Sequence, residues 1–288
     1  GYFAERSPIF KMPRSVGSDF AGIVVAIGAG AKVASLDPDG ALVLRDAQIG
    51  DAVYGDGIAG TGSFAEFVSV LGEQAVLKPP ELSFAEAACL GLAGLTAYQC
   101  LTQHATTPVG PGSKVLVLGG TGGVGSMAVQ IAKALGATVA ATGSKVDLLE
   151  SLGADVTINY REQDWSEVLA GQDYDLVFAT VNDATPLPAA ERALAVLGPT
   201  GSFHFLLESI KPADDLDLGG RKFEFFLTNS KDHSSLAKIG AMAAKGTIKA
   251  VLHNGQTFPF NAEGWGLLMA ESNSGRAKGK LVMKMDGK

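Results

Sequence analysis

Cysteine and histidine are both scarce in this 288-residue sequence. The two cysteines, Cys89 and Cys100, do not form a Cys-x-x-Cys pair, and the four histidines are scattered along the chain. Two thiols cannot build a disulfide framework, so a reducing compartment, the cytoplasm, is the predicted location. A zinc site needs several nitrogen, sulfur or oxygen ligands that converge, and no spacing of these residues supplies them.

Excess positive charge and long unbroken apolar runs are also missing. The formal net charge is −7, which argues against nucleic acid or an anionic membrane as the main partner. The most apolar stretch, 86–101, is interrupted by Gly91 and Gly94, so no membrane span is expected. Apolar residues make up 47% of the chain and charged residues 18%, which predicts a folded protein with a sizeable core.

Three catalytic motifs are absent. No tyrosine begins the Tyr-x-x-x-Lys pair of short-chain reductases, and neither His-Glu-x-x-His nor Gly-x-Ser-x-Gly occurs. These absences argue against a short-chain reductase, a zinc protease and an α/β-hydrolase.

The chain changes texture along its length. Short β-rich segments at 21–28, 41–45, 51–54 and 64–71 are separated by Gly and Asp, as in an all-β unit. Ser83 and Glu86 then form a capping box that predicts helices over 84–92 and 94–104.

Alternating strands and helices follow. Strands are predicted at 114–118, 137–142, 155–159, 174–180, 201–207 and 223–228, and helices at 124–135, 145–152, about 164–170 and 187–197. This alternation predicts a doubly wound parallel sheet of the Rossmann type. Towards the end we expect a helix at 235–245, a strand at 248–252, an irregular stretch, and a strand at 279–285.

A glycine-rich loop follows the first strand of the alternating part. Its residues are Gly119, Gly120, Thr121, Gly122, Gly123, Val124 and Gly125, and Gly120, Gly122 and Gly125 match G-x-G-x-x-G. A strand before it and a helix directly after it are the context that this motif requires. The backbone can then approach a pyrophosphate, and the helix N-terminus presents free N–H groups. The alternative is a tight strand-to-helix turn without a ligand.

The end of the second strand of this part distinguishes the two nicotinamide cofactors. An NAD enzyme carries Asp or Glu there for the ribose 2′-hydroxyl, whereas this chain has Ser144 and Lys145. A hydroxyl, a helix start and an ammonium suit a 2′-phosphate, which predicts NADPH. The alternative for Lys145 is an ordinary solvated lysine.

Several motifs resemble one family in its order along the chain. They are the segments 16–22, 50–55, 62–67, 94–98, the glycine loop, 151–155 and 275–282. The pattern is similar to the zinc-free medium-chain dehydrogenase/reductases, in the quinone-oxidoreductase-like and enoyl-reductase-like branch. The resemblance implies a GroES-like all-β catalytic domain at 1–100, completed by 233–288, a Rossmann domain at 101–232, and an active site in the cleft.

The resemblance also suggests roles for individual residues. Ser18 stands where zinc-dependent members have the ligand histidine, so no metal is expected. Family members hold the 2′-phosphate with residues that match Lys145, Tyr160 and Arg276. Thr96 matches a threonine near the nicotinamide, although a structural role as a helix threonine is the alternative. Family members begin several tens of residues earlier, so either the full protein is longer or its active site is more open, and Tyr2 is a further candidate facing the substrate.

The predicted function is therefore an NADPH-dependent reductase of a quinone or of the activated C=C of an α,β-unsaturated carbonyl, without zinc. The alternative is a non-catalytic protein that binds or senses NADPH with the same fold. A homodimer is expected, because residues 223–228 form an apolar last strand whose edge invites pairing with a second copy.

Overall fold

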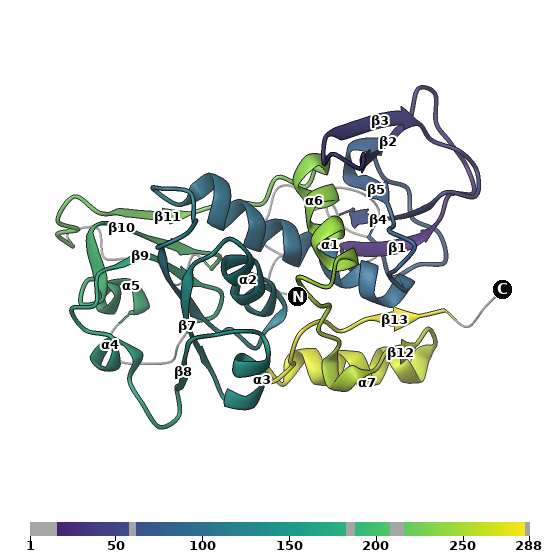
Figure 1. The fold of residues 1–288 in the computed structure, drawn as a ribbon. Helices are drawn as coiled ribbons and strands as arrows, with labels where there is room; N and C mark the ends of the chain where they lie inside the picture. Colours follow the sequence, from purple (N-terminus) through teal and green to yellow (C-terminus); the bar gives the residue numbers. More distant parts are fainter. Residues whose placement is uncertain (1–15, 58–61, 183–187, 208–215, 286–288) are drawn as a thin grey trace. The chain divides into compact units, whose positions relative to one another are not determined.

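The computed structural model describes residues 16–57, 62–182, 188–207 and 216–285 (Figure 1). The chain divides into two compact units. Unit 1 contains Gly1–Leu95 and Asn229–Lys288, and unit 2 contains Thr96–Thr228. Unit 1 is thus built from two separate stretches of the chain, and unit 2 from one.

Unit 2 is organised around a six-stranded sheet in which every paired strand is parallel. The strand order is β11-β10-β9-β6-β7-β8, with β6 at Lys114–Leu118, β7 at Thr138–Gly143, β8 at Val156–Asn159, β9 at Tyr174–Ala179, β10 at Leu197–Phe205 and β11 at Lys222–Phe225. Counted along the chain this order is 6-5-4-1-2-3, that of a Rossmann fold. The predicted doubly wound sheet is confirmed, and β6 has the predicted bounds.

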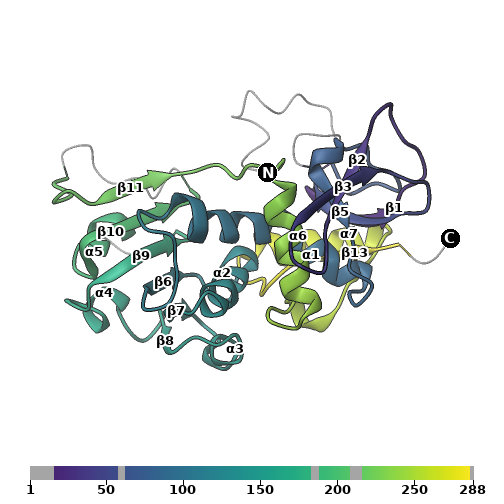
Figure 2. The same ribbon diagram turned by 45° about the horizontal axis from the view of Figure 1, so that its top comes forward.

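The central strands are buried along almost their whole length. In β6 only Lys114 is exposed, and in β9 only Asp175. Continuous burial requires cover on both faces, which is why these strands are apolar runs rather than alternating ones. The connecting helices are α2 (Gly123–Ala134), α3 (Val146–Ser151), α4 (Trp165–Val168) and α5 (Ala189–Ala193), drawn among the strands in Figures 1 and 2.

Unit 1 contains a five-stranded, mainly antiparallel sheet. Its order is β1-β4-β5-β2-β3, with β1 at Asp19–Ile23, β2 at Lys32–Leu36, β3 at Leu42–Asp46, β4 at Ala52–Asp56 and β5 at Ala75–Leu77. Only β2 and β5 run parallel. The expected β-rich first part is therefore confirmed, although β2 and β5 were not predicted and residues 64–71 form no strand.

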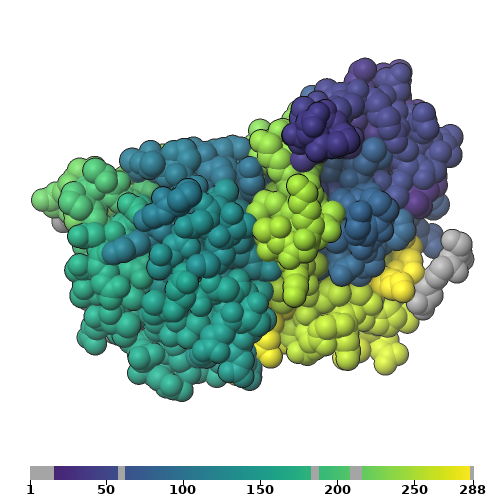
Figure 3. Space-filling view, in the orientation of Figure 1, coloured from purple at the N-terminus to yellow at the C-terminus, as the bar shows by residue number. Residues whose placement is uncertain are grey.

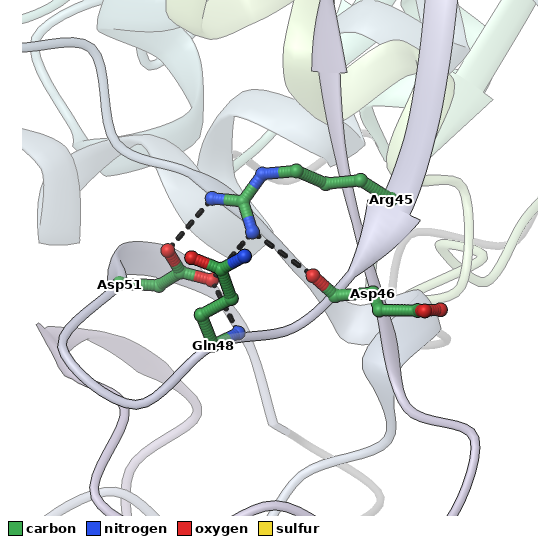
Figure 4. A network of polar contacts seen from close by, with 4 residues as sticks. All are labelled: Arg45, Asp46, Gln48 and Asp51. Atoms are coloured by element: carbon green, nitrogen blue, oxygen red, sulfur yellow. Dashed lines mark hydrogen bonds and ion pairs between the residues drawn. The ribbon is translucent and has the colours of Figure 1, made fainter.

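An ion pair secures the turn that connects β3 to β4 (Figure 4). The Arg45 guanidinium donates to both carboxylate oxygens of Asp51 at 2.7 and 3.0 Å, and also to the carbonyl of Asp46 at 2.9 Å. The backbone N–H of Gln48 donates to the same Asp51 carboxylate at 2.8 Å. The hydrogen bonds from Arg45 lower the pKa of Asp51, so the carboxylate stays charged well below neutral pH.

The second stretch of unit 1 packs against the first. The buried Tyr54 hydroxyl donates to the carbonyl of Leu236 at 2.6 Å, and the Lys280 ammonium lies 2.5 Å from the Asp19 carboxylate. Leu236 belongs to α6 (His233–Ala244). In Figure 3 the C-terminal residues, yellow-green to yellow, lie beside the blue and purple N-terminal ones. These contacts join residues 182 and 261 positions apart.

The C-terminal part differs from the sequence expectation. The stretch expected to be irregular contains α7 (Ala262–Asn273), which Asn261 caps by accepting from the N–H of Gly264 at 2.8 Å. The predicted strand 248–252 is reduced to one bridge between Leu252 and Lys280. The last strand, β13 (Met283–Lys284), pairs with β12 (Phe258–Pro259) and is shorter than predicted.

The two predicted helices 84–92 and 94–104 form one continuous helical stretch. It consists of α1 (Phe84–Gln99), with a kink at Gly91, and a π-helical turn at Cys100–His104. Ser83 and Glu86 form the predicted capping box, with hydrogen bonds of 2.8 and 3.2 Å. By length and composition this helix could cross a membrane, contrary to the expectation from its glycines, but 67% of its most apolar window is buried inside the protein, as in a core helix.

Candidate cofactor-binding site

The glycine loop lies at the point where the strand order of the unit 2 sheet reverses. It connects β6 to α2, and β6 pairs with β7 on one side and β9 on the other. In open α/β sheets, ligands bind beyond the carboxyl ends of the strands at this switch point. The topology therefore places the predicted motif where a dinucleotide site is expected.

Two threonines that the sequence analysis did not single out hold the start of the loop. Thr142, at the end of β7, accepts the N–H of Gly119 on its hydroxyl at 3.0 Å and the N–H of Gly120 on its carbonyl at 2.8 Å. Thr180, directly after β9, donates its hydroxyl to the carbonyl of Leu118 at 2.8 Å. Hydrogen bonds from residues at the ends of both neighbouring strands thus fix the backbone at the start of the loop, where Gly119 and Gly120 have no side chains.

The glycines of the loop serve different purposes. Gly119 has a φ of +84°, which favours glycine. A Cβ on Gly120 would lie 2.8 Å from Leu149 and 2.9 Å from Ala141, and a Cβ on Gly125 would overlap the carbonyl of Gly119. Gly120 and Gly125 are therefore required by packing between helix and sheet.

Gly122 is different because it has room around it. A Cβ there would meet only the carbonyl oxygen of Gly119, at 3.4 Å, which is an ordinary contact. Its φ of −79° is open to any residue. The packing of the protein itself therefore gives no reason for glycine at this position, whereas close approach of a ligand to the backbone does.

Helix α2 begins at this loop and offers donors to such a ligand. Its N-cap is Gly122, which has no side chain to accept a hydrogen bond from the first turn. The first N–H groups of an α-helix have no acceptor within the helix, so they are available to an anion. Thr121, Gly122, Gly123 and Val124 are half-buried, and Gly125 is buried. The predicted loop residues thus lie together at one helix start.

The register of β7 and β8 places the residues predicted to bind the 2′-phosphate at the carboxyl ends of these two strands. Gly143 and Asn159 are register partners at the ends of these parallel strands. Ser144 and Lys145 follow the first, and Tyr160 follows the second. Lys145 is exposed, Ser144 is half-buried and Tyr160 is 52% exposed, so all three side chains are accessible. The helix after Lys145 has only six residues, shorter than predicted.

The other candidates lie elsewhere. Thr96 is buried, and its hydroxyl lies 2.6 Å from that of Thr228, so the first and last residues of unit 2 are joined. Arg276 is an exposed residue of unit 1, after α7. Tyr2 is outside the described residues. The roles of these three stay predictions.

Metal ligands do not converge in the part of the chain that the structure describes. No group of three or more His, Cys, Asp or Glu side chains there is arranged to hold a metal ion. Ser18 is half-buried, and its carbonyl accepts from the N–H of Gly57 at 2.8 Å. The carboxylate of the neighbouring Asp19 forms an ion pair with the ammonium of Lys280.

The Asp19–Lys280 pair is itself a strong local feature. Burial lowers the pKa of the Lys280 ammonium, but the charge of Asp19 and its hydrogen bond outweigh burial, so the pKa is raised overall. Asp19 also accepts the backbone N–H of Leu92, next to the kink at Gly91. This pair therefore fixes α1 and the C-terminal part to β1 within unit 1.

The nucleotide-binding part matches a described family. The family model of zinc-binding dehydrogenases (ADH_zinc_N) matches residues 123–211, which begin at α2. The match covers α2 and the strands β7 to β10 and does not include Ser18, so it concerns the Rossmann part of a dehydrogenase.

Curated relatives extend the similarity to nearly the whole chain. The chain is 34% identical to a 2-methylene-furan-3-one reductase of Solanum lycopersicum over 97% of its length, and 32% identical to an NADPH-dependent alkenal/one oxidoreductase, chloroplastic, of Arabidopsis thaliana over 97%. It spans 65% of each of these two plant proteins. It is also 32% identical to a trans-enoyl reductase of Aspergillus terreus, and covers 79% of that protein.

A solved structure agrees with these relatives. The quinone oxidoreductase of Coxiella burnetii superposes with a TM-score of 0.76 at 26% identity, over 96% of this chain and 80% of that one. The fold and the site define a protein of the dinucleotide-binding class, with a Rossmann unit and a second unit that contains a mainly antiparallel β-sheet. Within that class, the chain belongs to the medium-chain dehydrogenase/reductase family, in the branch of quinone oxidoreductases and enoyl reductases.

Proposed function

We propose that the protein is an NADPH-dependent reductase that transfers hydride to a quinone or to the activated C=C of an α,β-unsaturated carbonyl, without zinc. The observation that carries this proposal is that two features lie at the carboxyl ends of adjacent strands. An open glycine, Gly122, caps the helix after β6, and Lys145 follows the end of the adjacent strand β7. The first suits a pyrophosphate and the second suits a phosphate on the ribose next to it.

The preference for NADPH rests on the charges at the end of β7. No carboxylate occupies the strand end, where Asp or Glu would accept from the 2′-hydroxyl of NADH. The first acid after it, Asp147, lies inside α3. With the exposed Lys145, the half-buried Ser144 and the accessible Tyr160, the edge offers an ammonium and two hydroxyl groups to a phosphate.

The proposed reaction places requirements on the chain's own residues. When bound, the cofactor would supply a hydride to the β-carbon of the substrate. The chain would have to stabilise the negative charge that collects on the distant carbonyl oxygen with hydrogen-bond donors, since the described residues offer no cluster for a Lewis-acidic ion. The hydroxyl of Thr96 is our candidate donor near the reacting ring, by the family resemblance.

The substrate class rests on the names of the relatives. They reduce a methylene-furanone, an alkenal or alkenone, and an enoyl group, each of which contains a C=C bond conjugated to a carbonyl. Because this chain spans 65% of the plant relatives' length, its own activity is a proposal from shared residues.

The test is a titration followed by a turnover assay. Dissociation constants for NADPH and NADH are measured by fluorescence for the wild type and for Lys145→Ala at one salt concentration. A charge-assisted contact to phosphate contributes about 1.5–3 kcal/mol, so NADPH should bind about ten- to a hundredfold more weakly to the variant, and NADH almost unchanged. An unchanged ratio of the NADPH and NADH dissociation constants in the variant would show that Lys145 does not bind the 2′-phosphate.

The turnover assay separates the two functions considered from the sequence. The wild type should oxidise NADPH in the presence of an enone or a quinone. A protein that only binds or senses the cofactor would show affinity without turnover across a panel of such substrates.

We also propose a homodimer that forms through β11. This strand is the edge of the unit 2 sheet, and its last residue, Phe225, is 40% exposed, followed by Leu227 at 68%. An uncovered apolar edge is stabilised by pairing with a second copy. Light scattering across micromolar concentrations should give twice the chain mass, and a monomer at every concentration would contradict the proposal.

A further inference from the structure

A second cation lies near Lys145, at the carboxyl ends of the parallel strands. Arg161 is exposed and comes two residues after Asn159, the last residue of β8. Lys145 comes two residues after Gly143, the last residue of β7. Because Gly143 and Asn159 are register partners on neighbouring parallel strands, the two cations leave the sheet at equivalent positions on adjacent strand ends.

The Arg161 side chain packs against the ring of its neighbour Tyr160. Its guanidinium carbon lies 5.8 Å from the centroid of the Tyr160 ring, within cation–π range. Its backbone N–H donates to the Asn159 side-chain oxygen at 3.2 Å. The exposed Tyr160 ring therefore serves as a support for the guanidinium at the strand end.

The nearest acid in sequence does not neutralise Arg161. The Glu162 carboxylate accepts from the Asn159 side-chain amide at 2.7 Å and so turns back towards the strand. Among the residues that the structure describes, no carboxylate lies within 4.0 Å of the Arg161 guanidinium or of the Lys145 ammonium. In a chain with a net charge of −7, two cations without ion pairs on adjacent strand ends form a local positive site.

We propose that Arg161 is a second phosphate-binding residue, which together with Lys145 determines the choice of NADPH over NADH. This inference rests on the proposed function. A phosphate monoester carries about −1.5 to −2 charges at pH 7, more than one ammonium can balance. A guanidinium adds a planar pair of donors that matches two phosphate oxygens. The Tyr160 hydroxyl and the Arg161 fork would then bind the phosphate from the β8 side, and Lys145 from the β7 side.

The experiment compares NADPH and NADH binding to Arg161→Ala, Arg161→Lys and Lys145→Ala. Loss of the guanidinium should weaken NADPH binding about tenfold and change NADH binding by less than about twofold. Arg161→Lys keeps the charge but loses the fork, so its NADPH affinity should fall between wild type and alanine. Binding of 2′,5′-ADP should weaken in parallel with that of NADPH, since it carries the same phosphate.

Lys114→Ala is the matched control. Lys114 is an exposed cation of the same sheet, but it is the first residue of β6 and so lies at the amino ends of the strands. Its ammonium donates to the Gln172 carbonyl. This variant should bind both cofactors like the wild type. Thermal unfolding of every variant confirms that the fold is retained.

The outcomes separate the two levels of the argument. Equal weakening of NADPH and NADH in Arg161→Ala would place the guanidinium on the shared adenosine and overturn its phosphate role. No effect of Arg161→Ala, with a clear effect of Lys145→Ala, would overturn this inference alone. An unchanged NADPH-to-NADH ratio in both alanine variants would overturn the proposed cofactor site as a whole.

Discussion

Replacing Gly122 with alanine should weaken cofactor binding while leaving the stability of the fold almost unchanged. In Gly122→Ala the new Cβ would lie 3.4 Å from the Gly119 carbonyl oxygen and otherwise in open space, and the φ of −79° suits alanine. Alanine is a poorer N-cap than glycine by up to about 1 kcal/mol, whereas the smaller entropy of its unfolded chain contributes about 0.4–1 kcal/mol in the other direction. The free energy of unfolding should therefore stay within about 0.5 kcal/mol of the wild type.

Cofactor binding should respond very differently to the same change. The methyl group would stand where the pyrophosphate must approach the first turn of α2. Loss of one charge-assisted contact costs about 1.5–3 kcal/mol, or about a ten- to hundredfold weaker affinity. NADPH and NADH should be affected equally, because both carry the pyrophosphate.

Gly125→Ala is the contrasting variant. Its Cβ would overlap the Gly119 carbonyl oxygen and lie 2.9 Å from the Gly120 Cα, so α2 and the loop must move apart. Such overpacking typically destabilises a fold by about 1–3 kcal/mol. Calorimetry and a fluorescence titration on both variants check the reasoning. If Gly122→Ala binds NADPH as well as the wild type does, the loop is not the pyrophosphate site.

Three further predictions concern stability and metal dependence. Because the hydrogen bonds from Arg45 lower the pKa of Asp51, the charged carboxylate stabilises the fold above its unfolded pKa, and this contribution is lost as the pH falls through the lower folded value. Asp51→Asn should therefore cost about 1 kcal/mol near neutral pH and less in acid, as measured by denaturant unfolding from pH 2 to 7; a cost independent of pH would contradict this. Burial lowers the pKa of His204 to about 4, against the attraction of Glu224, so the unfolded chain takes up a proton between about pH 6.5 and pH 4 that the folded protein does not. As the pH falls through that window, the free energy of unfolding should decrease by as much as about 3 kcal/mol. His204→Phe should flatten this dependence of stability on pH, whereas an equally steep dependence in the variant would assign the effect to other groups. Dialysis against a chelator should leave NADPH oxidation unchanged, because Ser18 stands where a ligand histidine would be needed; activity lost on chelation and restored by zinc would refute this.

The nucleotide-binding unit was largely predictable from the sequence because its signals are local. The run Lys114–Leu118 is apolar after its first residue and contains two β-branched valines, and glycines follow it at the positions that a strand-to-helix turn needs. Gly136, with a φ of +92°, follows α2 as its predicted stop. Each of these features depends on residues close together in the chain, so propensity and tertiary structure agree.

The missed helix α7 shows where local signals fail. Gly264 and Gly266 interrupt its first turns and lower its helix propensity. A Cβ on Gly264 would overlap the Pro259 carbonyl, so the close packing of the helix on the preceding chain requires glycine there. Tertiary contact overrides propensity at this position, and the capping residue Asn261 was the remaining signal in the sequence.

The predicted strand 64–71 was wrong because no described strand pairs with it. Its first and last residues make hydrogen bonds outside any strand, from the Phe64 N–H to the Val16 carbonyl at 3.0 Å and from the Leu71 N–H to the Gln74 side-chain oxygen at 3.1 Å, and Phe67 is 72% exposed. Alternation of apolar residues therefore does not guarantee a partner strand. At the proposed cofactor site, the contacts of Thr142 and Thr180 and the position of Arg161 beside Lys145 depend on which strands are neighbours and in what register. Neither the neighbours nor the register can be read from one segment alone.

The discontinuous course of unit 1 has a consequence for how the protein is made. Tyr54 and Asp19 find their partners, Leu236 and Lys280, only in the last part of the chain to be synthesised. Residues 96–228, in contrast, contain all six strands of their sheet in one stretch. During translation the nucleotide-binding unit can complete its core first, while the earlier residues 1–95 must wait for the C-terminal residues before theirs closes. Ribosome-bound chains that end before α6 should therefore already contain a folded nucleotide-binding unit, attached to a first stretch of unit 1 that is still incomplete.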